Sequence, residues 1–463
     1  MPDNTHAAGS TPGPRAPLDA RTQRLLTAPV LPTLLRLAAP NMLVMLAQSS
    51  VGLIETYFVS RLGIDALAGL SMVFPVLILV QTMSSGAMGG AIISAVARAL
   101  GQGRREHAAD LAWYALAAAL AFGTFTTVLL LTGGAALYRL MGGEGEVLRA
   151  ALSYSHIVFG GAMLIWIFNL LAAVIRGTGA MTLPTLVVVG GAVALLPLSP
   201  ALIFGFGPLP RLGVAGGAAA IVLYYLAGCL IFIWHLWRGK CLVRPAARPP
   251  RLHWMPLRDL LRVGAWSSIV GTSANLTIAG VTGFVALHGV SAVAGYGAGN
   301  RLEYMVIPLT FGLGIPISVL IATSLGAGDL ARAARVTWTG AAVAFVICEV
   351  IGLVAALWPE AWIGTFGADP HMISTGVAYL HIAGPCYGFF GLGQAFYFAA
   401  QGRGQVAVPA FGAALRMVAA LGGCWIAQRL GASVHWLFAS VGLGMLVLAA
   451  VNVLATLNGG RKK

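Results

Sequence analysis

The 463-residue chain is 58% hydrophobic and only 9% charged, with a mean hydropathy of +0.86. Soluble domains carry about 25% charged residues, so this composition excludes a soluble protein and indicates a polytopic membrane protein. The net charge of +14 would suit a nucleic-acid partner, but the basic residues lie between apolar runs rather than in one basic domain.

Twelve apolar runs follow one another along the chain. A membrane-spanning helix needs about 20 apolar residues, and each run is long enough. We therefore predict an all-α polytopic membrane protein with twelve transmembrane helices, at approximately residues 34–60, 66–97, 109–132, 150–174, 181–206, 213–236, 260–286, 292–324, 336–357, 375–400, 406–428 and 433–456. Residues 1–30 are polar and proline-rich, which predicts a disordered cytoplasmic tail rather than a cleaved signal peptide.

Most of the 28 lysines and arginines lie in connections on one side of the predicted membrane, among them Arg104, Arg105 and Arg332. By the positive-inside rule, this bias places both termini in the cytoplasm of a multi-pass inner-membrane protein. The basic charge is then a topology signal and a contact for anionic lipids, so we expect no nucleic-acid partner. Nothing in the sequence calls for a second subunit, and we expect a monomer.

The second half of the chain repeats the first. The stretch from Leu34 to Met72 matches Leu260 to Ala298 at a shift of 226 residues. After a slip of one residue the match continues at a shift of 225, through the pairs Leu100-Gly101 and Leu325-Gly326, Tyr154-x-His156 and Tyr379-x-His381, and Gly177-x-Gly179 and Gly402-x-Gly404. Six spans per copy is an even number, so both copies enter the membrane from the same side and the repeat is parallel.

The repeat divides the chain into two six-helix lobes. We predict an N-lobe at residues 31–237 and a C-lobe at residues 258–457. Residues 238–257 are rich in proline and arginine and show no apolar period, which indicates a cytoplasmic linker between the lobes. Residues 458–463 form a short cytoplasmic tail.

Only three of the fourteen acidic residues lie well inside a predicted span: Glu55, Glu303 and Glu349. A charged group at the bilayer centre costs about 2.5 kcal/mol or more, so it usually faces a cavity or a partner. Glu55 occurs in the first copy only, and desolvation there favours a carboxyl group that loads and releases a proton; a helix–helix hydrogen bond is the alternative. Glu303 can form a structural ion pair or line a cavity, but Arg301, two residues away, does not face it on a helix.

No enzyme signature is visible in the chain. There is no glycine-rich phosphate loop with lysine, no HExxH and no GxSxG sequence. The five cysteines are scattered, without the spacing of a metal site, and indicate small apolar packing residues. We therefore expect neither an enzyme nor a bound metal or cofactor.

Several segments carry a family resemblance. In the first copy they are PNMLVMLAQSSVGLIETYFVSRLGIDALAG from Pro40, LGQGRREHA from Leu100 and RGTGAMTLP from Arg176; in the second they are NRLEYMVIPLTFGLG, LGAGDLARA and QGRGQVAVP. Together they resemble the MATE (multidrug and toxic compound extrusion) family, in its prokaryotic DinF-like branch. The resemblance covers about residues 31–457. It implies twelve helices in two lobes that open alternately to the two sides of the membrane.

The resemblance assigns roles on the first helix. Glu55 falls where many members of this branch carry an Asp, and Pro40 matches the proline at which that helix is proposed to bend. The fifth helix departs from the pattern, because Leu195 and Ser199 stand where those members place Asn and Asp. The N-lobe site is thereby reduced to one carboxylate.

These observations together predict a secondary active antiporter that exports organic, cationic and amphipathic compounds in exchange for protons, with Glu55 as the proton-coupling residue. Sodium is the alternative coupling ion, because carbonyl or amide oxygens could complete a cage for it. A lipid-linked oligosaccharide flippase and a channel or receptor without coupled transport are the rival functions. Candidate residues of the substrate cavity are Gln48, Tyr57, Trp166, Asn169, Ser199, Asn275, Asn300, Arg301, Glu303 and Tyr304.

Overall fold

The structure is a computed structural model that describes residues 18–206, 210–239, 241–250 and 253–461. Within these ranges the chain is helical and has no strand. A short helix, α1 (Ala20–Thr27), precedes the N-lobe, which contains α2 (Val30–Ser60), α3 (Ile64–Gln81), η1 (Thr82–Met88), α4 (Gly89–Gly101), α5 (Arg105–Leu140), α6 (Gly145–Gly160), α7 (Ala162–Gly177), α8 (Thr182–Phe204) and α9 (Val214–Trp237). The C-lobe contains α10 (Trp254–Ala286), α11 (Val290–Ala327), α12 (Leu330–Leu357), α13 (Pro359–Ile363), α14 (Pro370–Ala383), η2 (Gly384–Cys386), α15 (Tyr387–Arg403), α16 (Ala407–Arg429) and α17 (Val434–Arg461).

The helices confirm the predicted multi-pass membrane fold. Among the described residues, ten helical segments are long and apolar enough to cross a bilayer, and the pair α6 and α7, bent by 47°, provides an eleventh. The segment from α14 through η2 to α15 is the counterpart of that bent pair. Gly161 between α6 and α7 and Cys386 in η2 are equivalent at the 225-residue shift, so both copies interrupt the same helix at the same place.

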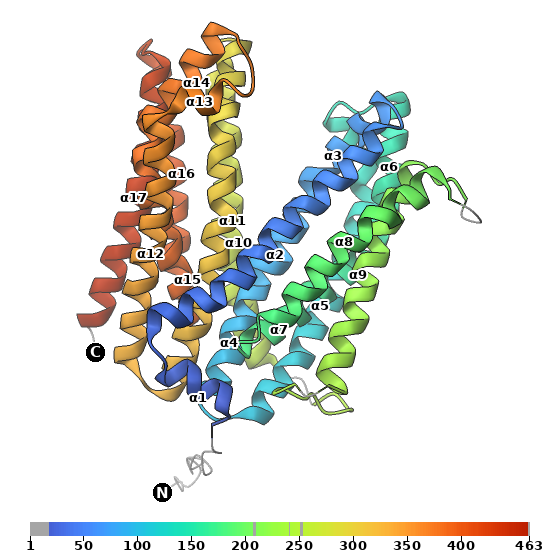
Figure 1. Cartoon of the computed structure of the whole chain (residues 1–463), viewed down its shortest axis with the longest axis vertical. Helices are drawn as coiled ribbons and strands as arrows, with labels where there is room; N and C mark the ends of the chain where they lie inside the picture. The colour runs from blue at the N-terminus through green and yellow to red at the C-terminus, as the bar shows by residue number, and fades with distance from the viewer. Residues whose placement is uncertain (1–17, 207–209, 240, 251–252, 462–463) are drawn as a thin grey trace, which may run out of the picture.

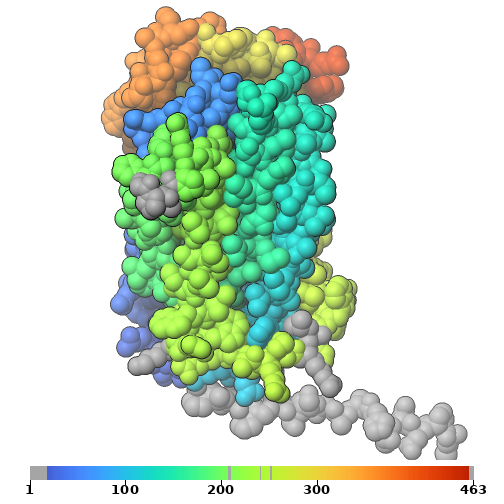
Figure 2. Space-filling view, turned by 90° about the vertical axis from the view of Figure 1, so that its right-hand side faces the viewer, coloured from blue at the N-terminus to red at the C-terminus, as the bar shows by residue number. Residues whose placement is uncertain are grey.

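The two lobes are bundles that touch at one end and diverge toward the other (Figure 1). The end where they touch carries the connections from α4 to α5, from α9 to α10 and from α11 to α12; we call it the arginine-rich end, after Arg104, Arg105 and Arg332. The opposite end carries α13, α14 and the start of α3. Viewed from the side, α8, α9, α5 and α6 cover the N-lobe face, and the C-lobe shows above them at the diverging end (Figure 2).

Equivalent residues of the two copies meet where the lobes touch. A Cβ atom added to Gly101 would lie 2.2 Å from Thr323 O, and one added to Gly326 would lie 2.3 Å from Arg98 O. Gly101 and Gly326 are repeat equivalents, as are Gly86 and Phe311, which also come together. Contacts between equivalent residues of two copies are expected near a two-fold axis along the membrane normal, and these contacts confirm the parallel repeat.

Hydrogen bonds between the lobes have the same location. Asn41, Arg98 and Gln401 donate across the interface in the half that includes the arginine-rich end. Asn41 Nδ2 donates to the carbonyl oxygens of Phe311 and Gly312, Arg98 Nη1 donates to Gly402 O at 2.8 Å, and Gln401 Nε2 donates to Gly86 O at 3.3 Å. The lobes are thus closed at this end.

The N-terminal segment differs from the expected disordered tail. Residues 1–17 lie outside the described residues, but Ala20–Thr27 form α1, which Asp19 caps by accepting hydrogen bonds from backbone N–H groups of its first turn. Arg332 at the start of α12 donates to Leu25 O at 3.0 and 2.8 Å and to Ala28 O at 2.6 Å. A Cβ atom at Gly179, in the N-lobe, would lie 2.8 Å from Leu25 Cδ1, so α1 bridges both lobes.

The predicted boundaries of the linker and of the C-terminal tail differ from the structure by a few residues. α10 begins at Trp254, inside the linker predicted at residues 238–257. The C-terminal tail predicted from residue 458 is helical as far as Arg461, because α17 continues the last span without a break. Residues 462–463 lie outside the described residues. Hydropathy identifies the apolar centre of a span and is weak at its polar ends, which explains both differences.

Substitution of Gly326 by alanine should wedge the lobes apart at the arginine-rich end, because the new Cβ atom would overlap the backbone oxygen of Arg98, which cannot rotate away. With spin labels at Glu106→Cys and Leu330→Cys, we expect Gly326→Ala to lengthen the distance between the lobes in double electron–electron resonance. Gly133→Ala is the control, since a Cβ atom there meets open space. An unchanged distance distribution in Gly326→Ala would contradict this packing.

Candidate functional site

Glu55 lies inside the N-lobe and not on its surface. It stands on α2, five residues before that helix ends at Ser60, and only 2% of the residue is exposed. Helix α9 passes close to its carboxyl group. A Cβ atom added to Gly217 on α9 would lie only 2.5 Å from Glu55 Oε1. The absence of a side chain at Gly217 is what leaves room for the carboxyl group between α2 and α9.

Two buried tyrosines share this region with Glu55. The hydroxyl groups of Tyr154 on α6 and Tyr225 on α9 both interact electrostatically with the Glu55 carboxyl group. Glu55 Oε1 and Tyr154 Oη are buried atoms without a hydrogen-bond partner among the described residues. We call Glu55, Tyr154, Gly217 and Tyr225 the Glu55 cluster. Because buried polar atoms are normally hydrogen-bonded, the cluster is suited to hold an exchangeable proton or another small polar species.

A hydrogen-bonded network adjoins the Glu55 cluster through Tyr225. Gln81 Oε1 accepts hydrogen bonds from Asn169 Nδ2 at 3.1 Å and from Tyr225 Oη at 3.3 Å. Asn169 Nδ2 also donates to Ser84 Oγ at 2.8 Å. Gln81 ends α3 and precedes the π-helix η1, an irregularity that is frequent at functional sites. Tyr225 therefore connects the carboxyl group on α2 with polar side chains of three other helical segments.

The C-lobe buries a carboxylate in a different way. Glu303 Oε1 accepts a hydrogen bond from Arg416 Nη2 at 2.8 Å, and Glu303 Oε2 accepts one from Tyr379 Oη at 3.1 Å. The guanidinium group of Arg416 also lies 4.7 Å above the ring of Phe390. Of the two roles expected for Glu303, the structure shows the ion pair across helices, with Arg416 as the partner.

The repeat makes these two carboxylates directly comparable. Tyr154 and Tyr379 are repeat equivalents, so each lobe places the same tyrosine beside a buried glutamate. Arg416 has no such equivalent, because the position 225 residues earlier is Gly191. No salt bridge of the described residues includes Glu55. Only the C-lobe therefore neutralises its glutamate with a fixed cation.

Several cavity candidates are enclosed within a lobe. Trp166 is 2% exposed, stacks on Phe122 and donates from Nε1 to Thr126 Oγ1 at 3.2 Å. Ser199 and Asn300 are buried, and Ser199 Oγ and Asn300 Oδ1 have no hydrogen-bond partner among the described residues. Contact of these residues with a substrate stays a prediction. Their burial means that such contact requires the lobe to open locally.

The remaining candidates are more exposed. Tyr57 is 54% exposed and Tyr304 is 49% exposed. Arg301 is exposed as well, and its guanidinium group lies 4.9 Å above the ring of Phe366. Asn275 is exposed and donates to the carbonyl of its own helix at Gly271, while Gln48 on α2 is partly buried.

Helix α2 runs without a break through Pro40. Proline lacks a backbone N–H group and disturbs the helix one turn earlier, which is why a bend was expected there. The carbonyl oxygen of Pro40 accepts a hydrogen bond from Thr185 Oγ1 on α8 at 3.0 Å. This contact ties the proline to the N-lobe interior, and bending of α2 at Pro40 stays a prediction.

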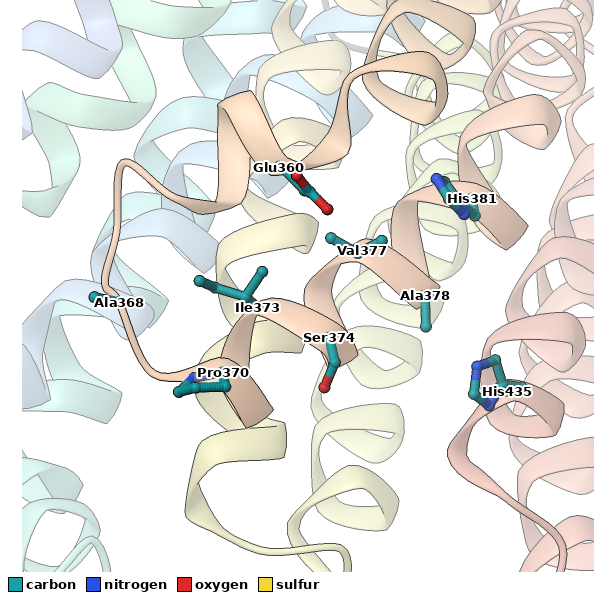
Figure 3. A pocket seen from close by; sticks show the side chains of 9 residues that line it. All are labelled: Glu360, Ala368, Pro370, Ile373, Ser374, Val377, Ala378, His381 and His435. Atoms are coloured by element: carbon teal, nitrogen blue, oxygen red, sulfur yellow. The ribbon is translucent and has the colours of Figure 1, made fainter.

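A crevice of about 630 Å³ opens at the diverging end of the C-lobe, and Glu55 is not among its lining residues. Its lining residues come from α13, the loop after it, α14 and α17 (Figure 3): Glu360, Ala368, Pro370, Ile373, Ser374, Val377, Ala378, His381 and His435. Among the described residues, no three histidine, cysteine or acidic side chains are arranged to hold a metal ion. The crevice has no connection to the Glu55 cluster and we assign it no chemistry.

Sequence reasoning missed most of the Glu55 cluster. Tyr154 belongs to the repeated Tyr-x-His pattern, which indicates the duplication and gives no sign of a contact with Glu55. Gly217 belongs to a pair of small residues of the kind that lets helices approach closely, and nothing in the sequence relates it to Glu55. Gln81 and Tyr225 lie 144 residues apart, and only the fold brings them together.

Substitution of Gly217 by alanine should displace the Glu55 carboxyl group without unfolding the lobe, because a side-chain end can move where a backbone atom cannot. We expect a shifted carboxyl C=O stretching band in infrared difference spectra, assigned to Glu55 by its loss in Glu55→Gln. The melting temperature should change by no more than about 3 °C. Gly190→Ala, where a Cβ atom meets open space, should leave the band in place. An unshifted band in Gly217→Ala would show that Gly217 does not control this carboxyl group.

The chain matches the MatE family model over residues 40–201 and 268–426, one segment in each lobe. It is 28% identical over 380 residues to a protein of Shewanella oneidensis named FAD transporter. The match covers 80% of this chain and 81% of the relative. It is 26% identical over 377 residues to the probable multidrug resistance protein NorM of Thermotoga maritima, with 81% of each chain covered.

The fold agrees with the same family. A crystal structure of MATE in the bent conformation superposes with a TM-score of 0.88 at 22% identity, covering 95% of this chain and 97% of the other. The family model alone matches well over half of the chain, in the two segments that the repeat predicts. MATE proteins are transporters and not enzymes, which agrees with the lack of enzyme signatures. The chain belongs to the MATE family of membrane transporters.

Proposed function

We propose that this protein is a secondary active antiporter that exports organic, amphipathic compounds in exchange for inward-moving protons. Family membership supports transport of small molecules across a membrane. The names of two relatives, multidrug resistance protein and FAD transporter, support organic compounds as the class of substrate. The contrast between the two buried glutamates supports the proton as the coupling ion.

The unpaired state of Glu55 carries the proposal. A buried ionised carboxylate is costly unless a cation compensates its charge. Arg416 provides that cation for Glu303 permanently, at 2.8 Å, and no residue provides it for Glu55 among the described salt bridges. Glu55 therefore depends on a mobile cation. A carboxyl group that takes up and gives up this cation is what exchange requires.

A proton suits this site better than sodium. Sodium, like other hard cations, is normally bound by several oxygen ligands. Around Glu55 lie one carboxyl group and two tyrosine hydroxyls, and the amide oxygen of Gln81 already accepts hydrogen bonds from Asn169 and Tyr225. Leu195 supplies no ligand at the position where related proteins carry a polar group. A proton needs only the one carboxyl group.

The arrangement of the lobes supports alternating access. If the arginine-rich end is cytoplasmic, as the positive-inside rule requires, the lobes are closed toward the cytoplasm and diverge toward the outside (Figure 1). Both termini then lie in the cytoplasm, and in a bacterium the membrane is the inner one. Protonation of Glu55 and binding of substrate would favour different lobe arrangements, which is the condition for coupling. We further propose that the protein acts as a monomer.

The preference for cationic compounds that the sequence predicts is not part of this proposal. Binding of a cation would be favoured by an exposed carboxylate between the lobes. Glu55 and Glu303 are each only 2% exposed, and each lies inside its own lobe. They are also the only acidic residues on α2 and α11, the helices through which the lobes meet.

Glu55→Gln should still bind substrate but lose transport driven by a pH gradient, by about tenfold or more, because an amide cannot alternate between charge states. Glu55→Asp should keep part of the activity. The matched control is Glu349→Gln, whose amide oxygen can still accept the hydrogen bond that Glu349 receives from Gly388 N at 2.9 Å. The measurement is transport into proteoliposomes at fixed membrane potential.

Two outcomes would contradict the proposal in different ways. Wild-type transport by Glu55→Gln under a pH gradient would place coupling at another residue. Transport driven by a sodium gradient alone, and not abolished by a protonophore, would identify sodium as the coupling ion. Each gradient must therefore be imposed separately.

A further inference from the structure

One side of α11 is exposed between the lobes at the diverging end. Near the arginine-rich end this side meets the N-lobe, where Asn41 Nδ2 donates to Phe311 O at 3.3 Å and to Gly312 O at 3.1 Å. Arg301 lies eleven residues before Gly312, about three turns at 3.6 residues per turn, so both residues lie on the same side of the helix. Arg301 is exposed. The helical period therefore directs Arg301 toward the space between the lobes. At this end of α11 the lobes diverge (Figure 1).

The charge of Arg301 is available to a ligand. Arg301 lies about 11 Å from the middle of α11 along the helix axis, at 1.5 Å per residue. This distance is within the half-thickness of a bilayer core, about 15 Å, where a guanidinium group needs water or an anion and not lipid. Neither salt bridge of the described residues includes Arg301, whose guanidinium group lies over the ring of Phe366.

Apolar and aromatic side chains surround this cation. Tyr304 is 49% exposed, Met305 is 56% exposed and Phe366 is 37% exposed. Trp362 donates from Nε1 to Ala298 O at 3.0 Å and packs edge-on against Phe366. The loop that carries Phe366 is thereby fixed to α11, so the aromatic surface beside Arg301 is preformed. Together these side chains offer apolar and aromatic surface next to a positive charge.

The facing wall on α2 has the same character. Met42 on α2 contacts α11 at Gly312. Leu53 lies eleven residues after Met42, on the same side of α2, and is 71% exposed. One turn further on, Tyr57 is 54% exposed, and the guanidinium group of Arg61 lies 5.0 Å above its ring. This wall therefore also combines apolar and aromatic surface with an arginine at its outer end.

No acidic group balances these arginines at membrane depth on the two helices. The acids of α2 and α11 are Glu55 and Glu303, which are buried within the lobes. The acid that follows Arg61 most closely is Asp65, in the first turn of α3 at the outer end of the lobe. The charge that α2 and α11 expose to the space between the lobes is positive.

We propose that this transporter moves amphipathic aromatic anions, with Arg301 binding the anionic group and the Tyr304, Met305 and Phe366 surface contacting the ring. This inference rests on the proposed transport function and specifies its substrate class. The planar guanidinium group donates two parallel hydrogen bonds to a carboxylate, sulfonate or phosphate, which an ammonium group cannot do. The ring of the ligand stacks on the exposed aromatic side chains.

The test uses fluorescent compounds that share a ring and differ in charge. Riboflavin and FMN differ by a phosphate group, and pyrene methylammonium and pyrene sulfonate carry opposite charges on one ring. Transport into proteoliposomes is driven by a pH gradient. We expect the anion of each pair to be transported about tenfold more efficiently than its neutral or cationic counterpart, the ratio produced by one charge-assisted hydrogen bond.

Variants of Arg301 test its role. Arg301→Ala should reduce kcat/KM for the two anions about tenfold and leave riboflavin unchanged, and Arg301→Lys should recover part of the loss for the anions. The matched control is Arg139→Ala, which removes an exposed arginine from the outer end of α5, on the same side of the membrane. Riboflavin transport shows that a variant is folded. Equilibrium quenching of FMN fluorescence measures binding independently of transport.

The outcomes separate this inference from the proposed function. If cationic pyrene moves and its sulfonate does not, the protein is a proton-coupled exporter but the substrate class is wrong. If Arg301→Ala lowers FMN and riboflavin transport equally, Arg301 does not recognise the anion. If a pH gradient moves none of the four compounds and FMN does not bind, both the inference and the assigned surface fail.

Discussion

Glu55 places a carboxyl group inside an apolar lobe, 2% exposed and outside both salt bridges of the described residues. A permanently ionised group in that position would be destabilising, because burial removes its hydration and no fixed cation replaces it. The surrounding sequence is adapted to this group. Gly217 gives it space, Tyr154 and Tyr225 provide hydroxyls near it, and Tyr225 passes the polar connection on to Gln81.

The duplication shows how one fold can treat two buried glutamates differently. Tyr154 and Tyr379 are the same residue in the two copies, and each lies beside a glutamate. The C-lobe adds Arg416, which forms a closed ion pair with Glu303; the N-lobe has Gly191 at that position. The charge of Glu303 is therefore permanently compensated, whereas compensation of Glu55 depends on the occupancy of its own carboxyl group. Contacts such as Gly101 with Gly326 join the two lobes near their common axis.

The sequence predicted the fold well for a physical reason. Spans are defined by their own apolar composition, and the repeat is defined by matches such as Leu100-Gly101 with Leu325-Gly326, so neither depends on distant contacts. The boundaries were less accurate, because α1 is a polar helix held by Arg332 from the other lobe. No local pattern indicates such a contact.

The candidate site was predictable only in part. Glu55 could be predicted because a single acidic residue within an apolar run is evident from the sequence alone. Its neighbours could not, because Tyr154 and Gly217 approach it only through the packing of α6 and α9 against α2. The helical period excludes Arg301 as the partner of Glu303, but it does not identify Arg416, which lies 113 residues away. Trp166 is a predicted cavity residue, but packing against Phe122 encloses it within the N-lobe.

Proton release on substrate binding tests the central claim most directly. The purified protein is titrated calorimetrically with a compound that it transports, in buffers of different ionisation enthalpy. The number of protons exchanged follows from the dependence of the observed binding enthalpy on the ionisation enthalpy of the buffer. We predict release of about one proton by the wild-type protein and none by Glu55→Gln, because in our proposal Glu55 gives up its proton when substrate binds. Equal proton release by both proteins, or none by the wild type, would contradict the account.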